Sequence, residues 1–204
     1  MMRPPRYYFL EAKLGLSRKT VADWSNFCRE LCSQWIEKTS VQVGGENCIV
    51  EIDEAKIGKR KCKKGRIIEG QWIFGGFERN TKKLFIEPVP NRSAETLLEI
   101  IKKWIKPETT IISDCWKSYK CLENEEYKHL TVNHKYNFVD PESNALRTSN
   151  VHGEILMVQP RFGTRQKHYS GYLAEFLFKH QFSYDKRIDE FFNIMAELYL
   201  LHDS

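Results

Sequence analysis

One short strand-like stretch decides the fold: Cys-Ile-Val-Glu-Ile-Asp-Glu at residues 48–54. A second stretch, Thr-Ile-Ile-Ser-Asp-Cys-Trp at residues 110–116, has the same pattern. In both, a run of apolar and β-branched residues, typical of a buried strand, leads to an aspartate. A carboxylate in that place lies at the rim of a core, where it is fixed and half desolvated. The sequence therefore predicts two strands that carry Asp53 and Asp114 near their ends.

Two such carboxylates on neighbouring strands would be close enough to share divalent cations. Hard cations such as Mg²⁺ take oxygen ligands and suit phosphate chemistry. The alternative is that each aspartate only begins a turn, and for one aspartate alone we would prefer that interpretation. We favour the metal hypothesis because two aspartates share the pattern and a basic stretch follows the first.

That basic stretch holds seven cations in eleven residues, between two predicted strands. A charge run is usually a solvated surface. Beside a metal-binding carboxylate, a basic hairpin instead favours a polyanion, and a phosphate backbone is the usual partner. A weaker alternative is that the run serves as a nuclear-import signal. The seven cations are Lys56, Lys59, Arg60, Lys61, Lys63, Lys64 and Arg66.

Composition indicates a globular chain of one domain plus a short appendage. The 204 residues are 41% hydrophobic and 29% charged, with a net charge of +5. No run of about 18 apolar residues predicts a membrane span, and the N-terminal residues have no signal-peptide core. The six cysteines have no disulfide-like spacing, so we expect reduced thiols in an intracellular protein. Cys28 and Cys32 are one helical turn apart and could ligate zinc, but packing is the favoured interpretation.

The expected elements make a mixed α/β sheet after an N-terminal helix. Residues 1–15 are expected to be irregular, and Ser17 is expected to cap an amphipathic helix that is either part of a helix-turn-helix or an ordinary packing helix. Two glycines, Gly75 and Gly76, are expected to mark a bulge or a close backbone approach. The expected strands are 48–54, 67–77, 83–89, 110–114 and 129–133, with helices at 93–103, 169–182 and 186–201, a short helix ending at 122, and a loop at 134–150.

Between Glu51 and Phe182 the chain resembles the Merlin-type DDE transposases, relatives of a group of insertion-sequence transposases. The resemblance covers about two-thirds of the chain, in order. Residues 17–32 also resemble the family's helix-turn-helix region, although the family usually begins further upstream. The matching stretches are Glu51-Ile-Asp-Glu-Ala-Lys-Ile-Gly-Lys-Arg-Lys, Gly70-Gln-Trp-Ile-Phe-Gly-Gly-Phe-Glu-Arg, Asn91-Arg-Ser-Ala-Glu-Thr-Leu, Thr110-Ile-Ile-Ser-Asp-Cys-Trp-Lys-Ser-Tyr, Leu130-Thr-Val-Asn-His, Phe138-Val-Asp-Pro-Glu, Phe162-Gly-Thr-Arg and Tyr172-Leu-Ala-Glu-Phe.

The resemblance implies a ribonuclease H-like fold and DNA strand cleavage and transfer with two ions of Mg²⁺ or Mn²⁺. Asp53 and Asp114 match the first two catalytic, metal-binding acids. The segment that normally carries the third acid departs from the pattern, and the expected glutamate position falls on or near His152. Glu154 is the nearest carboxylate and is our candidate for the third catalytic and metal-binding residue, although on a helix it would face away from His152.

We therefore expect a DNA transposase catalytic domain, with inactivation in the third-acid segment as an open question. The alternative is an inactive or co-opted DNA-binding protein derived from a transposase. The expected partner is double-stranded DNA, both transposon ends and target, with a homodimer left open and no membrane; the location is nuclear if the host is eukaryotic. Besides the basic run, Arg161 and Arg165 are candidate DNA contacts. The expected domains are an N-terminal helical segment at 1–45, a catalytic domain at 46–183 and a C-terminal helix at 184–204.

Overall fold

The computed structural model describes residues 7–57, 70–114, 119, 122, 125–132, 149–158 and 168–199. The chain divides into two compact units. One unit comprises residues 40–173 and contains a β-sheet, and the other comprises residues 1–39 together with 174–204 and is helical. The expected C-terminal helix thus belongs to the same unit as the N-terminal helices.

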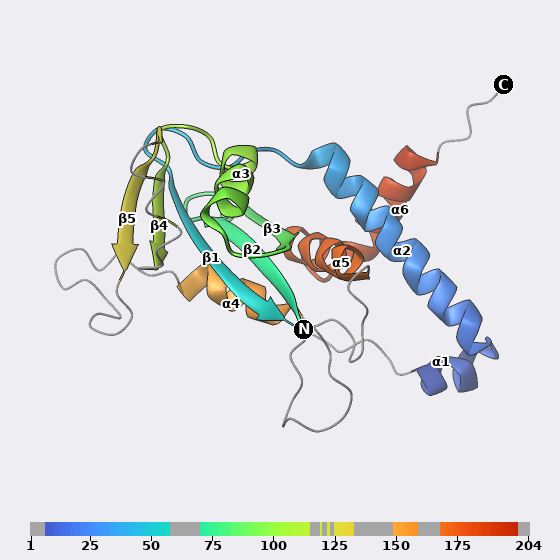
Figure 1. Ribbon diagram of the computed structural model, residues 1–204. Helices are drawn as coiled ribbons and strands as arrows, with labels where there is room; N and C mark the ends of the chain where they lie inside the picture. Colours follow the sequence, from blue (N-terminus) through green and yellow to red (C-terminus); the bar gives the residue numbers. More distant parts are fainter. Residues whose placement is uncertain are drawn as a thin grey trace. The chain divides into compact units, whose positions relative to one another are not determined.

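A mixed five-stranded sheet forms the centre of the larger unit (Figure 1). The strand order is β3-β2-β1-β4-β5. Strands β1, β2 and β3 pair antiparallel, whereas β4 pairs parallel with both β1 and β5. The expected mixed five-stranded α/β sheet flanked by helices is confirmed, while its ribonuclease H-like character stays a prediction. The strands are β1 (Ile49–Ile57), β2 (Gln71–Glu78), β3 (Leu84–Val89), β4 (Thr110–Asp114) and β5 (Lys128–Val132).

Helix α3 (Ala94–Trp104) covers one face of this sheet. Ser93 begins the helix as expected, because its side chain accepts a hydrogen bond from the backbone N–H of Thr96. Alternate residues of the central strand, Val50 and Ile52, point into the apolar core beneath α3. The other core members are Val43, Phe74, Phe85, Val89, Leu97, Ile100, Ile101, Ile105, Ile111, Tyr119 and Leu122.

Helix α4 (Ser149–Met157) packs against β1 and β2. A glycine of β2 allows this approach, since a Cβ at Gly75 would lie 3.2 Å from Cδ1 of Ile155. Gly75 pairs with Asp53, so it belongs to the set of alternate residues that faces away from α3. Helix α4 therefore covers the opposite face of the sheet from α3.

The paired glycines mark close approach rather than a bulge. Both Gly75 and Gly76 pair regularly with β1 and with β3, so the bulge alternative is wrong and the close-approach alternative is confirmed. On the α3 face, the Phe85 ring lies across Gly76, where a Cβ would come within 2.3 Å of Cε1 of that ring. Small residues here let an aromatic ring and a helix lie directly on the two faces of β2.

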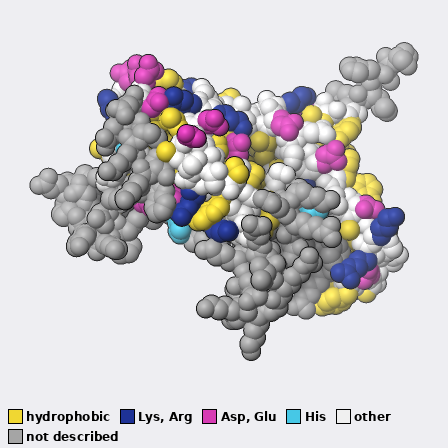
Figure 2. Space-filling view, in the orientation of Figure 1, with side chains coloured by type: hydrophobic (Ala, Val, Ile, Leu, Met, Phe, Trp, Pro, Cys, Tyr) yellow, Lys and Arg dark blue, Asp and Glu magenta, His cyan; other side chains and the backbone are white. Residues whose placement is uncertain are grey.

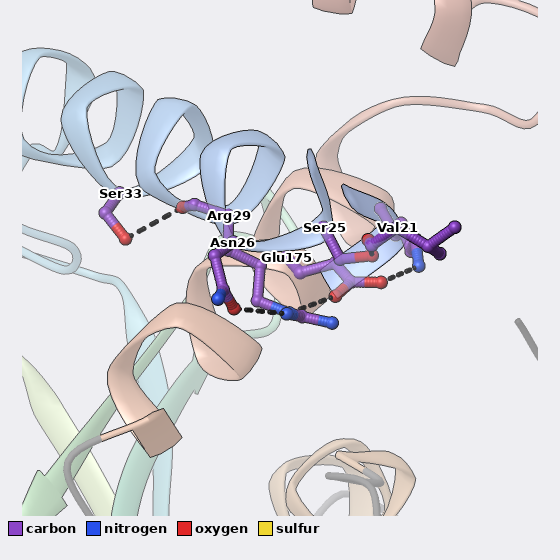
Figure 3. Close-up of polar contacts among 7 residues, drawn as sticks. Val21, Ser25, Asn26, Arg29, Ser33 and Glu175 are labelled. Atoms are coloured by element: carbon purple, nitrogen blue, oxygen red, sulfur yellow. Dashed lines mark hydrogen bonds and ion pairs between the residues drawn. The ribbon is translucent and has the colours of Figure 1, made fainter. Parts of the chain in front are cut away.

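Four helices make up the helical unit: α1 (Tyr7–Leu14), α2 (Arg18–Thr39), the part of α5 (Tyr169–Gln181) from Ala174 onward, and α6 (Arg187–Leu198). The apolar stripes of α2, α5 and α6 meet in a core that includes Leu31 and Phe178, with ring contacts such as Trp35 with Phe178. Polar contacts add to this packing (Figure 3). Arg29 of α2 donates from Nε to Glu175 of α5 over 3.0 Å, and Glu175 also pairs with Lys179.

Two expectations about segments without regular structure are wrong. Residues 7–14 form helix α1 instead of irregular chain, joined to α2 by a three-residue turn in which Gly15 has a φ of 63°. The expected loop at 134–150 overlaps α4, which begins at Ser149; residues 134–148 lie outside the described part. The expected cap at Ser17 is confirmed, because its Oγ accepts from the N–H of Thr20.

No helix in the described ranges is long and apolar enough to cross a bilayer.

The close contact at Gly76 gives a stability prediction. Gly76→Ala should lower the free energy of unfolding by about 1–3 kcal/mol, because the new methyl group forces the buried Phe85 ring out of place. Gly153→Ala is the matched control. Its added Cβ meets nothing within 4 Å on α4, and Ala in a helix interior is favoured over Gly by about 0.5–1 kcal/mol. Urea unfolding measures both; an unchanged midpoint for Gly76→Ala would contradict the packing described.

Candidate active site

Asp53 and Asp114 lie on adjacent parallel strands of the sheet. The paired residues of β1 and β4 run from Ile49 with Thr110 to Glu51 with Ile112. Continuing that register by two residues brings Asp53 opposite Asp114, and in-register neighbours point to the same face. The expectation of adjacent strands is therefore confirmed, while the catalytic roles of the two residues stay predictions.

His152 of α4 contacts the first of these aspartates. Its Nδ1 lies 2.6 Å from Oδ2 of Asp53, a short hydrogen bond. The Asp53 side chain is only 14% exposed, whereas that of His152 is 50% exposed. An ionised carboxylate can only accept, so Nδ1 carries the hydrogen when Asp53 is charged. His152, on or near which the resemblance places the expected third acid, thus points an imidazole at Asp53.

The packing of α4 explains why His152 and not Glu154 reaches Asp53. Val151, Ile155 and Val158 are buried at helical spacing, so they define the side of this segment that faces the core. His152 and Glu154 lie on opposite flanks of that stripe, about 200° apart around the helix axis. Only one flank can face β1 at Asp53. This geometry disfavours Glu154 as the third ligand, and its proposed role stays untested.

Both oxygens of Asp53 are already engaged. Besides the His152 contact at Oδ2, Oδ1 accepts the backbone N–H of Glu54 over 2.7 Å. Burial is the largest influence on this carboxyl and raises its pKa above the ordinary value, and His152 works in the opposite direction. The negative charge of Asp114 raises the pKa of Asp53 further. Asp53 therefore sits in a place where ionisation is costly without a compensating partner.

A third carboxylate, Glu54, is buried on the α3 side of the same strand. Its Oε2 accepts a short hydrogen bond from the Tyr119 hydroxyl, and its Oε1 lies 3.3 Å from Nη1 of Arg92. Burial raises the pKa of Glu54, the Tyr119 hydrogen bond lowers it, and the charges of Asp114 and Asp53 raise it. Glu54 was not among the site residues predicted from the sequence. The alternation of side chains along a strand places this acid on the buried face of β1, and that placement is the sequence feature that could have identified it.

The described side chains do not fit a site for two divalent cations. Asp53 and Asp114 offer oxygen ligands, as Mg²⁺ requires. The side of α4 next to these aspartates presents Nδ1 of His152 and not a carboxylate oxygen, and this nitrogen is hydrogen-bonded to Asp53. Within the described ranges, no group of three or more His, Cys, Asp or Glu residues is arranged to hold a metal ion. Among the described cysteines, Cys28, Cys32 and Cys48 have free thiols, and burial raises the pKa of Cys32 to about 12.

Most of the predicted DNA-contacting residues lie outside the described part of the chain. Lys56 is described, near the end of β1, three residues after Asp53. The other members of the basic run and the two later arginines fall in undescribed segments, so their roles stay predictions. These residues are Lys59, Arg60, Lys61, Lys63, Lys64, Arg66, Arg161 and Arg165.

Among solved structures, the chain is similar to one in the cryo-EM structure of a simian T-cell lymphotropic virus intasome in complex with PP2A regulatory subunit B56 gamma. The TM-score is 0.43 at 11% sequence identity. The match covers 66% of this chain and 49% of the other, so this chain spans about half the length of that protein.

Sequence comparison places the chain more specifically. An uncharacterized transposase-like protein of Haemophilus influenzae (strain ATCC 51907 / DSM 11121 / KW20 / Rd) is 29% identical over 94 residues, which are 46% of this chain and 76% of that protein. The ISXO2-like transposase domain family matches residues 42–181. The chain belongs to this transposase family. The narrower resemblance to Merlin-type enzymes stays a prediction.

The His152 contact leads to a prediction about metal binding. In His152→Glu, three carboxylates would converge, and Mn²⁺ should raise the unfolding temperature. A dissociation constant of about 1 mM and about 10 mM Mn²⁺ would give about 1.4 kcal/mol of stabilisation. Without metal the variant should be less stable than the unchanged chain, because a third like charge replaces a hydrogen-bond donor. The unchanged chain should respond to Mn²⁺ little, as measured by thermal unfolding.

Glu154→Gln provides the control for this prediction. Added to His152→Glu, it should leave the Mn²⁺ response intact, because position 154 lies on the other flank of α4. The account would be contradicted if Mn²⁺ stabilised the unchanged chain strongly and Glu154→Gln alone removed that effect. That pattern would identify a three-acid site built with Glu154.

Proposed function

We propose that the protein is a duplex-DNA-binding member of the transposase family in which strand cleavage and strand transfer are very slow or absent. The observation that carries this proposal is the hydrogen bond from His152 to Asp53. Asp53 is the residue that matches the first catalytic acid. With both of its oxygens bonded within the protein, it is not poised to serve a reacting phosphate.

A neutral imidazole is a poor substitute for the missing acid. It brings no negative charge, and Mg²⁺ prefers oxygen ligands. The fold, by contrast, is complete around this position: β1, β4 and α4 pack with buried apolar residues on both faces of the sheet. A stable fold with an altered third position suits a protein that keeps a binding function after losing turnover.

Binding to duplex DNA is supported by family membership and by the charge pattern. The chain carries a net charge of +5. On the described part of the face drawn in Figure 2, acidic and basic side chains are intermingled, so this part of the face has no separate basic patch. The densest positive charge in the sequence is the basic run that begins at Lys56. Clustered Lys and Arg bind phosphates without regard to sequence and release counterions. The transposon ends, the target, a homodimer and nuclear location stay open within this proposal.

An active transposase is the second candidate, and one observation favours it. The parallel register of β1 and β4 brings Asp53 and Asp114 together, as strand transfer with two ions of Mg²⁺ or Mn²⁺ requires. A chain selected only for DNA binding would not need both acids. In this candidate, Glu154 or a residue outside the described ranges would supply the third ligand.

One preparation can separate the two candidates. The purified chain should bind labelled duplex DNA, with log K falling as log salt rises, and should give no strand-transfer product with Mg²⁺ or Mn²⁺. Alanine at Lys59, Arg60, Lys61, Lys63 and Lys64 should flatten the salt dependence by about 0.9 for each phosphate contact that is lost.

Gel-shift titration and a strand-transfer assay on the same samples provide the readouts. Asp114→Asn is the control for any residual product, since it would abolish genuine turnover and leave background nuclease unchanged. Robust strand transfer that Glu154→Gln abolishes would overturn the proposal in favour of the active transposase. An unchanged salt slope in the alanine variant would show that the basic run does not contact DNA.

A further inference from the structure

Two cations and an indole ring meet where β1 and β2 run side by side. Trp72 is the strand partner of Lys56, and both side chains belong to the α3 face. The guanidinium carbon of Arg92 lies 4.0 Å from the centroid of the Trp72 ring, and Nζ of Lys56 lies 5.7 Å from it. Two positive charges thus share one aromatic ring at close range.

Arg92 is held in place by its neighbours. Its guanidinium packs on Trp72, and its Nη1 lies 3.3 Å from Oε1 of Glu54. Glu54 is itself fixed, because its other oxygen accepts the Tyr119 hydroxyl and its side chain is 3% exposed. The Arg92 side chain remains 31% exposed. An arginine with a fixed plane and a partly exposed fork of donors loses little entropy when it binds an anion.

Lys56 is also positioned by its neighbours. The stem of Lys56 runs alongside Gly70, where a Cβ would lie 3.2 Å from both its Cγ and its Cε. Lys56 is the second-last residue of β1, and Arg92 follows the end of β3. Strands β1 and β3 run in the same direction, because each pairs antiparallel with β2. Both cations therefore lie at the end of the sheet where β1 terminates.

We propose that Lys56, Trp72 and Arg92 form a platform that binds a backbone phosphate of duplex DNA at the end of β1, on the α3 face of the sheet and thus on the opposite face from Asp53. This deepens the proposed function and rests on it. Arginine's planar fork matches phosphate oxygens, and Lys56 adds a point charge on the same ring. The platform is continuous with the basic run, whose first member is Lys56. It would hold the duplex at this end of the sheet independently of any metal.

Salt-dependent binding to a labelled duplex of random sequence tests the platform. Between about 50 and 200 mM salt, Arg92→Gln should reduce the slope of log K against log salt by about 0.9, and Arg92→Gln with Lys56→Gln by about 1.8. Lys83→Gln is the matched control, because it removes one exposed charge from the β2–β3 turn at the opposite end of the sheet. Its slope should equal that of the unchanged chain.

Two further variants guard against misfolding and test the fork. Arg92→Gln with Glu54→Gln removes the acid that would lose its cation, and it should show the same reduced slope as Arg92→Gln. Arg92→Lys keeps the charge and should keep the slope, but it should bind several-fold more weakly because the planar fork is lost. Circular dichroism confirms that each variant is folded.

The outcomes separate this inference from the function on which it rests. No binding by the unchanged chain at low salt would overturn the proposed function and the platform together. Binding by the unchanged chain, with the same slope for Arg92→Gln as for Lys83→Gln, would overturn the platform alone.

Discussion

The crowding of three carboxylates, two in the middle of β1 and one at the end of β4, is the constraint on which this structure depends. Strand β1 continues to Ile57, so the expectation that Asp53 lies near the end of its strand is wrong. The parallel register of β1 and β4 brings Asp53 beside Asp114, and Glu54 follows directly on the buried face. Burial is the largest influence that raises the pKa of Asp53 and of Glu54, the charge of Asp114 raises both further, and the charge of Asp53 raises the pKa of Glu54. Compensation comes from the protein itself: His152 bonds Asp53, while Tyr119 and Arg92 bond Glu54.

The two faces of the sheet supply these partners by different routes. On one face, Gly75 lets α4 lie close enough for His152 to reach Asp53. On the other, the core under α3 holds Tyr119, and Arg92 lies just before the Ser93 cap of that helix. A protein of this transposase family that relies on its own side chains for charge balance has less need of cations beside these carboxylates. In the proposed function, this charge balance is the physical reason why DNA binding would persist without turnover.

The strand pair could be predicted from sequence, because runs of β-branched residues that lead to aspartates are a local signal. The helix caps at Ser17 and Ser93 are local signals too, and both are confirmed. Helix α1 was missed because an eight-residue segment after two prolines gives little periodicity to detect. The contacts of His152 with Asp53 and of Arg92 with Trp72 depend on how α4 and the loop after β3 pack. No spacing within the sequence specifies that packing. The sequence therefore indicated a departure from the family pattern on or near His152, but not the contact of His152 with Asp53.

The central claim is that His152 occupies the place of the third acid and holds Asp53. Anomalous diffraction from crystals of the unchanged chain soaked in Mn²⁺ tests it most directly. The account predicts no anomalous peak between Asp53 and Asp114, with Nδ1 of His152 still within hydrogen-bonding distance of Oδ2 of Asp53. A Mn²⁺ peak bridging the two aspartates, with an oxygen of Glu154 as a further ligand and His152 turned away, would contradict it.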